Sequence, residues 1–412
     1  MKKHMIPLTL SAASSLLVLA STVEAKTFTE SVQQGSSIKV NIRTRYEDVS
    51  EDVLDTSTDR EADAWTTRTR LSYTSGPWNG FSFGIEMDNV SEMTNDVDYR
   101  SAGNDTSFPA ATTAVIADPI GTEVNQGFIA YTDFNNQVKY GRQRLILDNS
   151  RFIGNVGWRQ NEQTYDGISW TNKTIRYTNF TYAYIKNVNR IFGESNPVLG
   201  DLHLDGHILN ASYSGFSAGK LIGYVYSLDV NDPVSQAGLT SDTFGLRWQG
   251  AIGDSFLYNL EYAMQKDAGA AELFDADYIL VEATYKVSRF SFTGGFESLG
   301  SDNGAYGFST PLATLHAFQG WADKFLATPA AGLEDKYINA GITFAGAQAM
   351  LSYHKFDSDV NSIDFGSEID FSLSRKFGAV MMTAKLAEYS MGDTNASFTD
   401  TSKFWLMADW SF

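Results

Sequence analysis

The sequence contains no cysteine, has fewer basic than acidic side chains, and lacks long apolar runs after its first 25 residues. The absence of cysteine excludes disulfide frameworks, Cys-ligated zinc, iron–sulfur clusters and thiol nucleophiles. The formal net charge of −18 argues against nucleic acid as a partner, because phosphate backbones require clustered basic residues. The chain is nevertheless 43% apolar and 13% aromatic, which excludes disorder.

The first 25 residues have the pattern of a secretory signal peptide. Lys2, Lys3 and His4 precede an apolar stretch over 5–20, and the small-residue pattern Val23-Glu24-Ala25 follows. We therefore expect residues 1–25 to be removed and residues 26–412 to form one domain. No later apolar run approaches 18 residues, so a membrane-spanning helix is not expected. A soluble exported protein and a transmembrane β-barrel remain.

Strict alternation of apolar and polar residues favours the barrel. At the end of the chain one face carries Phe404, Leu406, Ala408, Trp410 and Phe412. Alternate residues of a strand share a face, so this stripe faces one environment. A terminal phenylalanine on an apolar stripe resembles the assembly signal of bacterial outer-membrane proteins. We therefore expect the barrel-assembly machinery to recognise Phe412.

The same alternation predicts eighteen strands and an all-β, transmembrane, antiparallel up-and-down β-barrel. A soluble β-sandwich also alternates, but it would have to accommodate far too many aromatic residues at its strand ends. The expected strand cores are 37–47, 64–75, 81–89, 123–132, 138–147, 164–172, 174–185, 204–213, 220–228, 242–251, 256–266, 276–287, 290–298, 336–345, 348–356, 365–374, 379–389 and 403–412.

Short and long connections alternate between these strands. An even strand number places both termini in the periplasm, with short turns there and the long segments outside. The expected location is the outer membrane of a Gram-negative bacterium, in contact with lipid and lipopolysaccharide. The expected long segments are 48–63, 90–122, 148–163, 186–203, 229–241 and 299–335.

The energetics of charge in lipid decide which strand face points inward. A Lys or Arg facing lipid at the midplane costs roughly 2–4 kcal/mol, so the strand arginines must face the lumen. Eighteen strands enclose more volume than side chains can fill, which predicts a water-filled lumen, narrowed wherever a loop folds back into it. The predicted inward arginines are Arg43, Arg45, Arg68, Arg70, Arg142, Arg144 and Arg247.

One stretch of the chain resembles a known family. It runs Gly141-Arg142-Gln143-Arg144, Arg151-Phe152-Ile153-Gly154, Trp158-Arg159-Gln160 and Tyr165-Asp166-Gly167. This pattern resembles the alginate-export family of outer-membrane β-barrel porins. A second stretch, Thr310-Pro311-Leu312-Ala313-Thr314-Leu315-His316 with Gly320-Trp321-Ala322-Asp323-Lys324-Phe325, is similar to the long loop before the fourteenth strand of relatives.

The resemblance implies an arginine-lined conduit for anionic polysaccharide or smaller acidic solutes. Carried onto this chain, its constriction includes Arg142, Arg144, Arg151 and Arg159. Arginine suits this role because it is always charged and offers a fork of donors to carboxylates. The alternative is that Arg142 and Arg144 pair with Asp148, Glu162 or Asp166 and only hold the loop in place.

The residues predict no enzyme, no cofactor and no metal ion. Four histidines follow the signal peptide, His203, His207, His316 and His354, and none lies in a nucleophile motif. His203, Asp205 and His207 would share one face of a strand, which could bind a divalent ion, but three solvated residues at a strand rim are the simpler interpretation. The short stretch Trp321 to Leu326 could form a helical turn or simply cap the vestibule.

The predicted function is passive diffusion of small hydrophilic solutes through the outer membrane, favouring acidic sugars, oligosaccharides or organic anions. A general, weakly selective porin, a polysaccharide (alginate-like) export channel and a sealed structural barrel are the alternatives. The segment 48–63 holds seven acids against Arg60 alone, and 90–123 holds six against Arg100. The sequence thus predicts an acidic mouth over a basic throat, which would repel a polyanion entering from outside.

Overall fold

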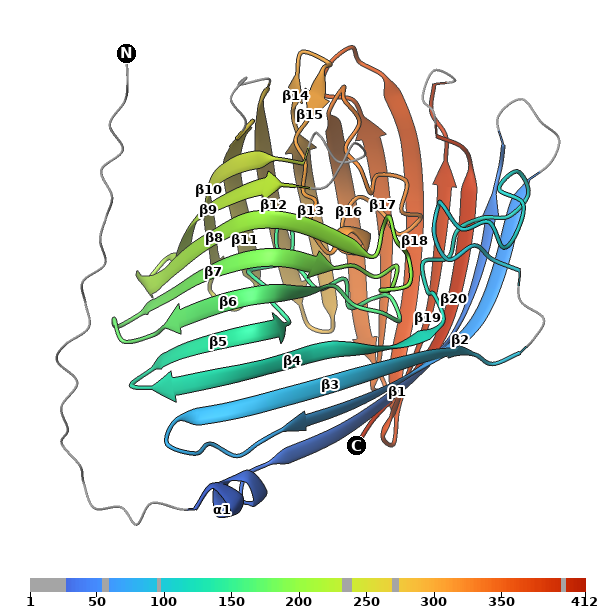
Figure 1. The fold of residues 1–412 in the computed structure, drawn as a ribbon. Helices are drawn as coiled ribbons and strands as arrows, with labels where there is room; N and C mark the ends of the chain where they lie inside the picture. Colours follow the sequence, from blue (N-terminus) through green and yellow to red (C-terminus); the bar gives the residue numbers. More distant parts are fainter. Residues whose placement is uncertain (1–26, 54–58, 95–97, 232–238, 269–273, 394–397) are drawn as a thin grey trace, which may run out of the picture.

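The computed structural model describes residues 27–53, 59–94, 98–231, 239–268, 274–393 and 398–412. The expected signal peptide lies outside these residues. Within them the chain forms a closed 18-stranded antiparallel barrel, as Figure 1 shows. The first strand pairs with the second and also with the last, for example Asn41 with Ser411, and this pairing closes the barrel. The predicted fold class and strand number are confirmed.

The strands correspond one to one with the expected segments. They are β1 (Ser37–Glu51), β2 (Arg60–Thr74), β3 (Phe81–Glu92), β4 (Gly121–Asp133), β5 (Asn136–Gln143), β6 (Thr164–Asn172), β7 (Thr178–Asn189), β8 (Asp201–Phe216), β9 (Gly219–Val230), β10 (Ser241–Ile252), β11 (Phe256–Lys266), β12 (Asp275–Val287), β13 (Phe290–Leu299), β16 (Leu333–Phe344), β17 (Ala347–Asp357), β18 (Asp364–Phe377), β19 (Val380–Ser390) and β20 (Thr401–Ser411).

Strand boundaries differ from the expected cores by up to four residues at several ends, and the fifth and seventh strands show why. The fifth strand was expected to reach residue 147 but ends at Gln143, because the following residue, Arg144, turns to contact Glu162. The seventh was expected over 174–185 but extends to Asn189, because a register shift between Ile185 and Asn187 lets its pairing with β8 continue.

The lipid-facing surface follows the alternation of the sequence. Outward side chains such as Ile38, Leu246 and Ile338 are 68%, 59% and 64% exposed, while the alternate residues Arg45 and Arg247 face inward and are buried. The exposed outward positions are therefore mainly apolar, while Arg45 and Arg247 are kept away from the bilayer, as the energy of charge in lipid requires.

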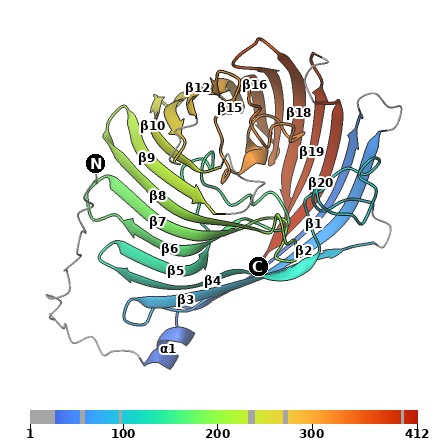
Figure 2. The same ribbon diagram turned by 45° about the horizontal axis from the view of Figure 1, so that its top comes forward.

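Two connections fold back into the barrel and build a core inside it. Residues 144–163 follow β5 and residues 308–332 precede β16, and both lie within the ring of strands in Figure 2. They touch each other where Gly154 N donates to Leu312 O at 2.8 Å. Phe152 and Phe308 are buried, and the aromatic ring of Phe152 packs against those of Phe308 and Tyr278. The predicted water-filled lumen is therefore narrowed by a packed apolar core.

Short elements complete the fold. The hairpin β14 (Ser301–Asp302) and β15 (Tyr306–Gly307) leads into the second inward segment, and a 3₁₀ turn covers Leu315–Ala317. The stretch Trp321–Leu326 forms bends and turns rather than a helical turn. Helix α1 (Phe28–Gln33) lies beside the β2–β3 turn, where Phe28 packs edge-on against Trp78, at the end of the barrel where the chain ends (Figure 1). Nowhere in the described ranges is a helix long and apolar enough to cross a membrane.

Candidate functional site

Arginines of β1 and β2 hold the Trp158-Arg159-Gln160 stretch by its backbone. Arg43 Nη1 donates to Gly157 O at 2.9 Å and Arg45 Nη1 to Trp158 O at 2.7 Å. Arg68 Nη1 donates to Gln160 O at 3.3 Å. Guanidinium groups carry several donors in a fixed fork, so one arginine can bind a carbonyl and a second partner together. The inward arginines predicted from strand alternation thus fix a loop across the lumen.

Four of the predicted arginines are buried, and their guanidinium groups make contacts of this kind. Arg45, Arg68 and Arg151 are 1%, 3% and 1% exposed, and Arg247 is also buried. Arg151 donates to Glu297 at 2.7 Å and to Thr310 at 3.2 Å, so it joins the first inward segment to β13 and to the second segment. Arg247 donates to Asn259 at 2.8 Å. In this arrangement these four groups stabilise the lumen wall rather than face its water.

Deeper in the lumen lies a cluster of acidic and basic side chains whose opposite charges nearly cancel. We call Arg70, Arg144, Glu86, Asp88 and Glu162 the balanced cluster. Arg70 Nε donates to Asp88 at 2.7 Å, and Arg144 donates to Glu86 at 2.8 Å and to Glu162 at 3.0 Å. Burial raises the pKa of the Glu162 carboxyl, but the charges of Arg70 and Arg144 outweigh burial and hold that pKa below its ordinary value.

The expected loop-holding carboxylates have three different partners. Glu162 contacts Arg144, as described, and Asp166 accepts from Arg142 Nε at 3.0 Å. Asp148 instead accepts from Asn210 Nδ2 of β8 at 2.7 Å. Arg142 also contacts Glu194 of the connection after β7. With side-chain exposures of 23% and 29%, Arg142 and Arg144 keep more contact with solvent than the other predicted arginines.

The glycines of the motif lie where the backbone leaves no room for a side chain. Gly141 has φ +120°, and a Cβ there would collide with Gly127 O of β4. Gly154 lies where the two inward segments meet, and a Cβ would collide with Thr314 Oγ1. These two positions therefore require glycine, because the backbone comes very close to the barrel wall at Gly141 and to the second inward segment at Gly154.

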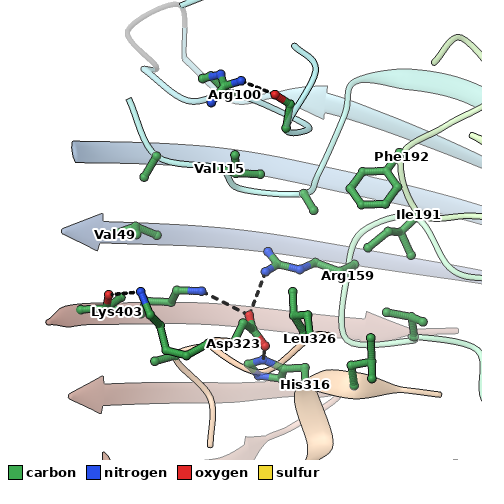
Figure 3. A pocket seen from close by; sticks show the side chains of 18 of the residues that line it. Val49, Arg100, Val115, Arg159, Ile191, Phe192, His316, Asp323, Leu326 and Lys403 are labelled. Atoms are coloured by element: carbon green, nitrogen blue, oxygen red, sulfur yellow. Dashed lines mark hydrogen bonds and ion pairs between the residues drawn. The ribbon is translucent and has the colours of Figure 1, made fainter. Parts of the chain in front are cut away.

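A cavity of about 580 Å³ lies between the two inward segments and the long connections. Apolar side chains also line it, among them Val115, Ile191, Phe192 and Leu326 (Figure 3). Among the described residues, the charged side chains that line the cavity are six cations and two carboxylates: Arg60, Arg100, Arg159, Arg190, Lys324 and Lys403, with Glu51 and Asp323. We call this space the cationic cavity.

The two carboxylates are shared among four of the cations. Lys324 Nζ lies 2.7 Å from Glu51, and Arg60 lies 3.4 Å from the same carboxylate. Asp323 Oδ2 lies 3.2 Å from both Arg159 Nη2 and Lys403 Nζ (Figure 3). The described lining of this cavity is thus net positive, although Glu51, Arg60 and Arg100 come from the segments 48–63 and 90–123 that are acidic overall. One acidic side chain of the segment 90–123 points into the barrel, since Asp118 contacts Arg45.

Asp323 also accepts a hydrogen bond from His316, whose Nδ1 lies 2.8 Å from Asp323 Oδ1. On the other side of the ring, Lys385 Nζ lies 2.8 Å from His316 Nε2. An ammonium can only donate, so Nε2 accepts and the ring proton is assigned to Nδ1. Burial, and next the charge of Lys385, lower the pKa of His316 to about 3, so the ring is neutral at ordinary pH.

Three tryptophans surround Lys385 on β19. Its Nζ lies 3.6 Å from the ring centre of Trp321, 4.1 Å from Trp158 and 5.4 Å from Trp405. Trp158 also stacks on His316 at 4.4 Å between ring centres. Cation–π contacts of this kind strengthen when they are withdrawn from water. Both inward segments are therefore fastened to the wall at β19 and β20.

Sequence reasoning missed several residues of this site. Asp323 and Lys324 lie in the stretch that carries the second resemblance, but no role follows from that pattern. Lys403 occupies the inward face of the last strand, opposite Phe404, so alternation could have identified it. Arg60 and Arg100 were counted only as minor charges in acidic segments.

A family comparison matches the description "Alginate export" over residues 35–277, more than half of the chain. The chain belongs to this family. It is an outer-membrane β-barrel porin. The resemblance inferred from the arginine and glycine motif is confirmed. A comparison with curated proteins found no match.

Solved structures of similar fold cover nearly the whole chain. OccAB2 of Acinetobacter baumannii is 20% identical with a TM-score of 0.70, covering 93% of this chain and 99% of its own. OpdK of Pseudomonas aeruginosa, solved with vanillate, is 12% identical with a TM-score of 0.69, covering 92% and 99%. OccK9 (OpdG) of the same organism is 13% identical with a TM-score of 0.68, covering 93% and 99%. At these identities the likeness shows the fold.

The residues considered for a metal ion have other partners. Asp205 accepts a hydrogen bond from Tyr184, and His207 Nδ1 lies 2.9 Å from the Tyr182 hydroxyl. Across the described ranges, no group of three or more His, Cys, Asp or Glu residues has the arrangement of a metal site.

Proposed function

We propose that this porin is a passive channel for small hydrophilic solutes that favours acidic sugars, oligosaccharides or organic anions. The observation that carries the proposal is the cationic cavity, in which six cations face two carboxylates. A cleft lined by one sign of charge attracts the opposite ion and raises its local concentration. The vanillate with which OpdK was solved is an organic anion, which supports the same solute class for a barrel of this fold.

The apolar side chains of the cavity suit the proposal. Ile191, Phe192 and Leu326 line the same cavity as the cations, and its volume is large enough for a small organic molecule. A solute with an acidic group and a less polar body would contact both kinds of side chain. Several weak contacts in succession let a solute enter and leave, which conduction requires.

The decisive measurement is the reversal potential of the purified protein in a planar bilayer under a KCl gradient. We expect preference for Cl⁻, and we expect Arg60→Gln and Lys324→Gln to reduce it. Lys336→Gln is the matched control, because Lys336 is half exposed on the outer face and pairs with Glu334 and Asp357. Preference for K⁺ in the unmodified protein would contradict the proposal.

A general, weakly selective porin predicts little preference and equal behaviour of all these variants. Export of an acidic polysaccharide is the second candidate, and membership of the alginate export family favours it. Polyuronate added on the periplasmic side should then block the ion current at lower uronate concentration than galacturonate does. The proposal treats the protein as a channel rather than an enzyme.

The membrane partners are part of the same proposal. The outward aromatic and aliphatic side chains would contact lipid and lipopolysaccharide. Phe412 is 61% exposed, and its backbone pairs with Val40 at 2.8 and 3.0 Å, so the last residue is fixed at the barrel seam. We propose that the assembly machinery recognises this exposed ring, and that Phe412→Ala lowers the amount of folded barrel in the outer membrane.

A further inference from the structure

Three donors from three separate parts of the chain converge on the carboxylate of Asp323. Arg159 comes from the first inward segment, His316 from the second, and Lys403 from β20 (Figure 3). Two cations and a neutral imidazole N–H form a complete set of partners for one carboxylate, since such charge-assisted bonds are the strong ones. The arrangement is what a binding site for a solute carboxylate requires.

Two of these donors have further contacts that hold them in place. Arg159 Nη1 donates to Glu47 at 2.9 Å. His316 is held by Lys385 and by stacking on Trp158. Lys403 is positioned by its strand, which is paired on both sides, and its ammonium contacts Asp323.

The backbone that delivers Asp323 is in an uncommon conformation. Asp323 has φ +59°, a left-handed value that few residues other than Gly, Asn and Asp adopt readily. Nearby, Gly320 has φ +78°, and a Cβ there would collide with the Glu368 side chain. Contacts with Arg159, His316 and Lys403 offset the cost of this backbone, and they place a carboxylate among the cations of the cavity wall.

We propose that Asp323 occupies a carboxylate-binding site formed by Arg159, His316 and Lys403, and that it competes there with the carboxylate of a passing solute. This inference rests on the proposed anion channel and names the residue that sets its preference. A tethered carboxylate is present at high effective concentration, so it weakens solute binding at this point. Weak binding favours passage over trapping.

The test is Asp323→Asn in a planar bilayer, with reversal potentials in KCl and block of the current by galacturonate. Asparagine tolerates the left-handed backbone, so this change removes mainly the charge. We expect the Cl⁻ to K⁺ permeability ratio to rise and galacturonate to bind about tenfold more tightly, because a close negative charge is removed. Glu388→Gln is the matched control, since Glu388 is exposed on the outer face at the same end.

A second variant covers the case in which Asp323→Asn does not fold, which gel mobility with and without heating would reveal. Lys403→Gln removes one cation of the site and should lower both anion preference and galacturonate affinity. If the unmodified channel prefers Cl⁻ but Asp323→Asn changes conductance for both ions equally, Asp323 only holds the loop and the inference is overturned. A cation-selective unmodified channel would instead overturn the proposed function itself.

Discussion

The balanced cluster and the cationic cavity contain the same kinds of residues but differ in their charge balance. In the balanced cluster two arginines face three carboxylates, and each of these five charges has a close opposite partner. In the cationic cavity six cations line the wall with two carboxylates. A buried charge without a partner is costly, so the deeper arginines are neutralised to hold the loop, and only the wider cavity leaves positive charge for solutes.

The largest effect is expected from breaking the balanced cluster. Glu162→Gln removes the buried carboxylate that contacts both Arg144 and Arg70, which keep Glu86 and Asp88 as partners, so we expect a loss of about 1–3 kcal/mol in the free energy of unfolding. Urea unfolding of the detergent-solubilised barrel measures this loss.

Asp166→Asn provides the control for that measurement. Asp166 also binds an arginine of β5, but its side chain is 33% exposed, so we expect a change of about 0–1 kcal/mol. Equal effects of the two substitutions would show that burial does not distinguish these ion pairs.

The second prediction compares the cationic cavity with an ion pair outside both regions by its effect on ion selectivity. Lys324→Gln removes a cation from the cavity and should lower the Cl⁻ to K⁺ permeability ratio about threefold to tenfold. The double variant Arg142→Gln/Asp166→Asn removes one charge of each sign outside the cavity and should leave the ratio nearly unchanged. A larger shift of the permeability ratio in the double variant would show that charges outside the cationic cavity set the ion selectivity.

The third prediction concerns pH. Because the folded pKa of His316 is about 3, the unfolded chain takes up a proton near its ordinary pKa of about 6.5 while the folded chain does not. His316 therefore makes stability fall as pH drops from about 6.5 towards 3, by at most about 1.4 kcal/mol per pH unit. The free energy of unfolding, measured across this pH range, should change less with pH in His316→Gln than in the unmodified protein.

The control for the pH experiment is His207→Gln, since that ring lies on the exposed face beside Tyr182. It should keep the pH dependence of the unmodified protein. The same dependence in His316→Gln and the unmodified barrel would show that His316 is protonated in the fold.

The smallest effect is expected from salt. The cationic cavity is reached by ions, so raising KCl from about 0.1 M to about 1 M, which shortens the Debye length from about 10 to about 3 Å, should reduce Cl⁻ preference modestly. The buried pairs of the balanced cluster are screened less, so unfolding free energy should change little. A large loss of stability in high salt would contradict the assignment of those pairs as buried.

Much of the fold was predictable because the alternation that marks each strand depends only on residues close together in the sequence. Glu86 and Asp88 alternate with Phe81, Phe83 and Ile85, so their inward direction followed from the sequence even though their pairing with Arg70 did not. The burial of Arg151 could not be predicted, because its partner Glu297 is 146 residues away. The contact exists only when the loop after β5 folds across the barrel.

The sequence by itself determined the barrel, its eighteen strands, the inward direction of Arg43, Arg45, Arg68 and Arg247, and the family, because alternation and motifs are properties of neighbouring residues. Only the tertiary structure decided which cations remain available to solutes. Asp118 reaches Arg45, and Asp323 reaches Arg159 and Lys403, through loops folded into the lumen. Net charge counts residues, whereas selectivity depends on which opposite charges come within a few ångströms of each other.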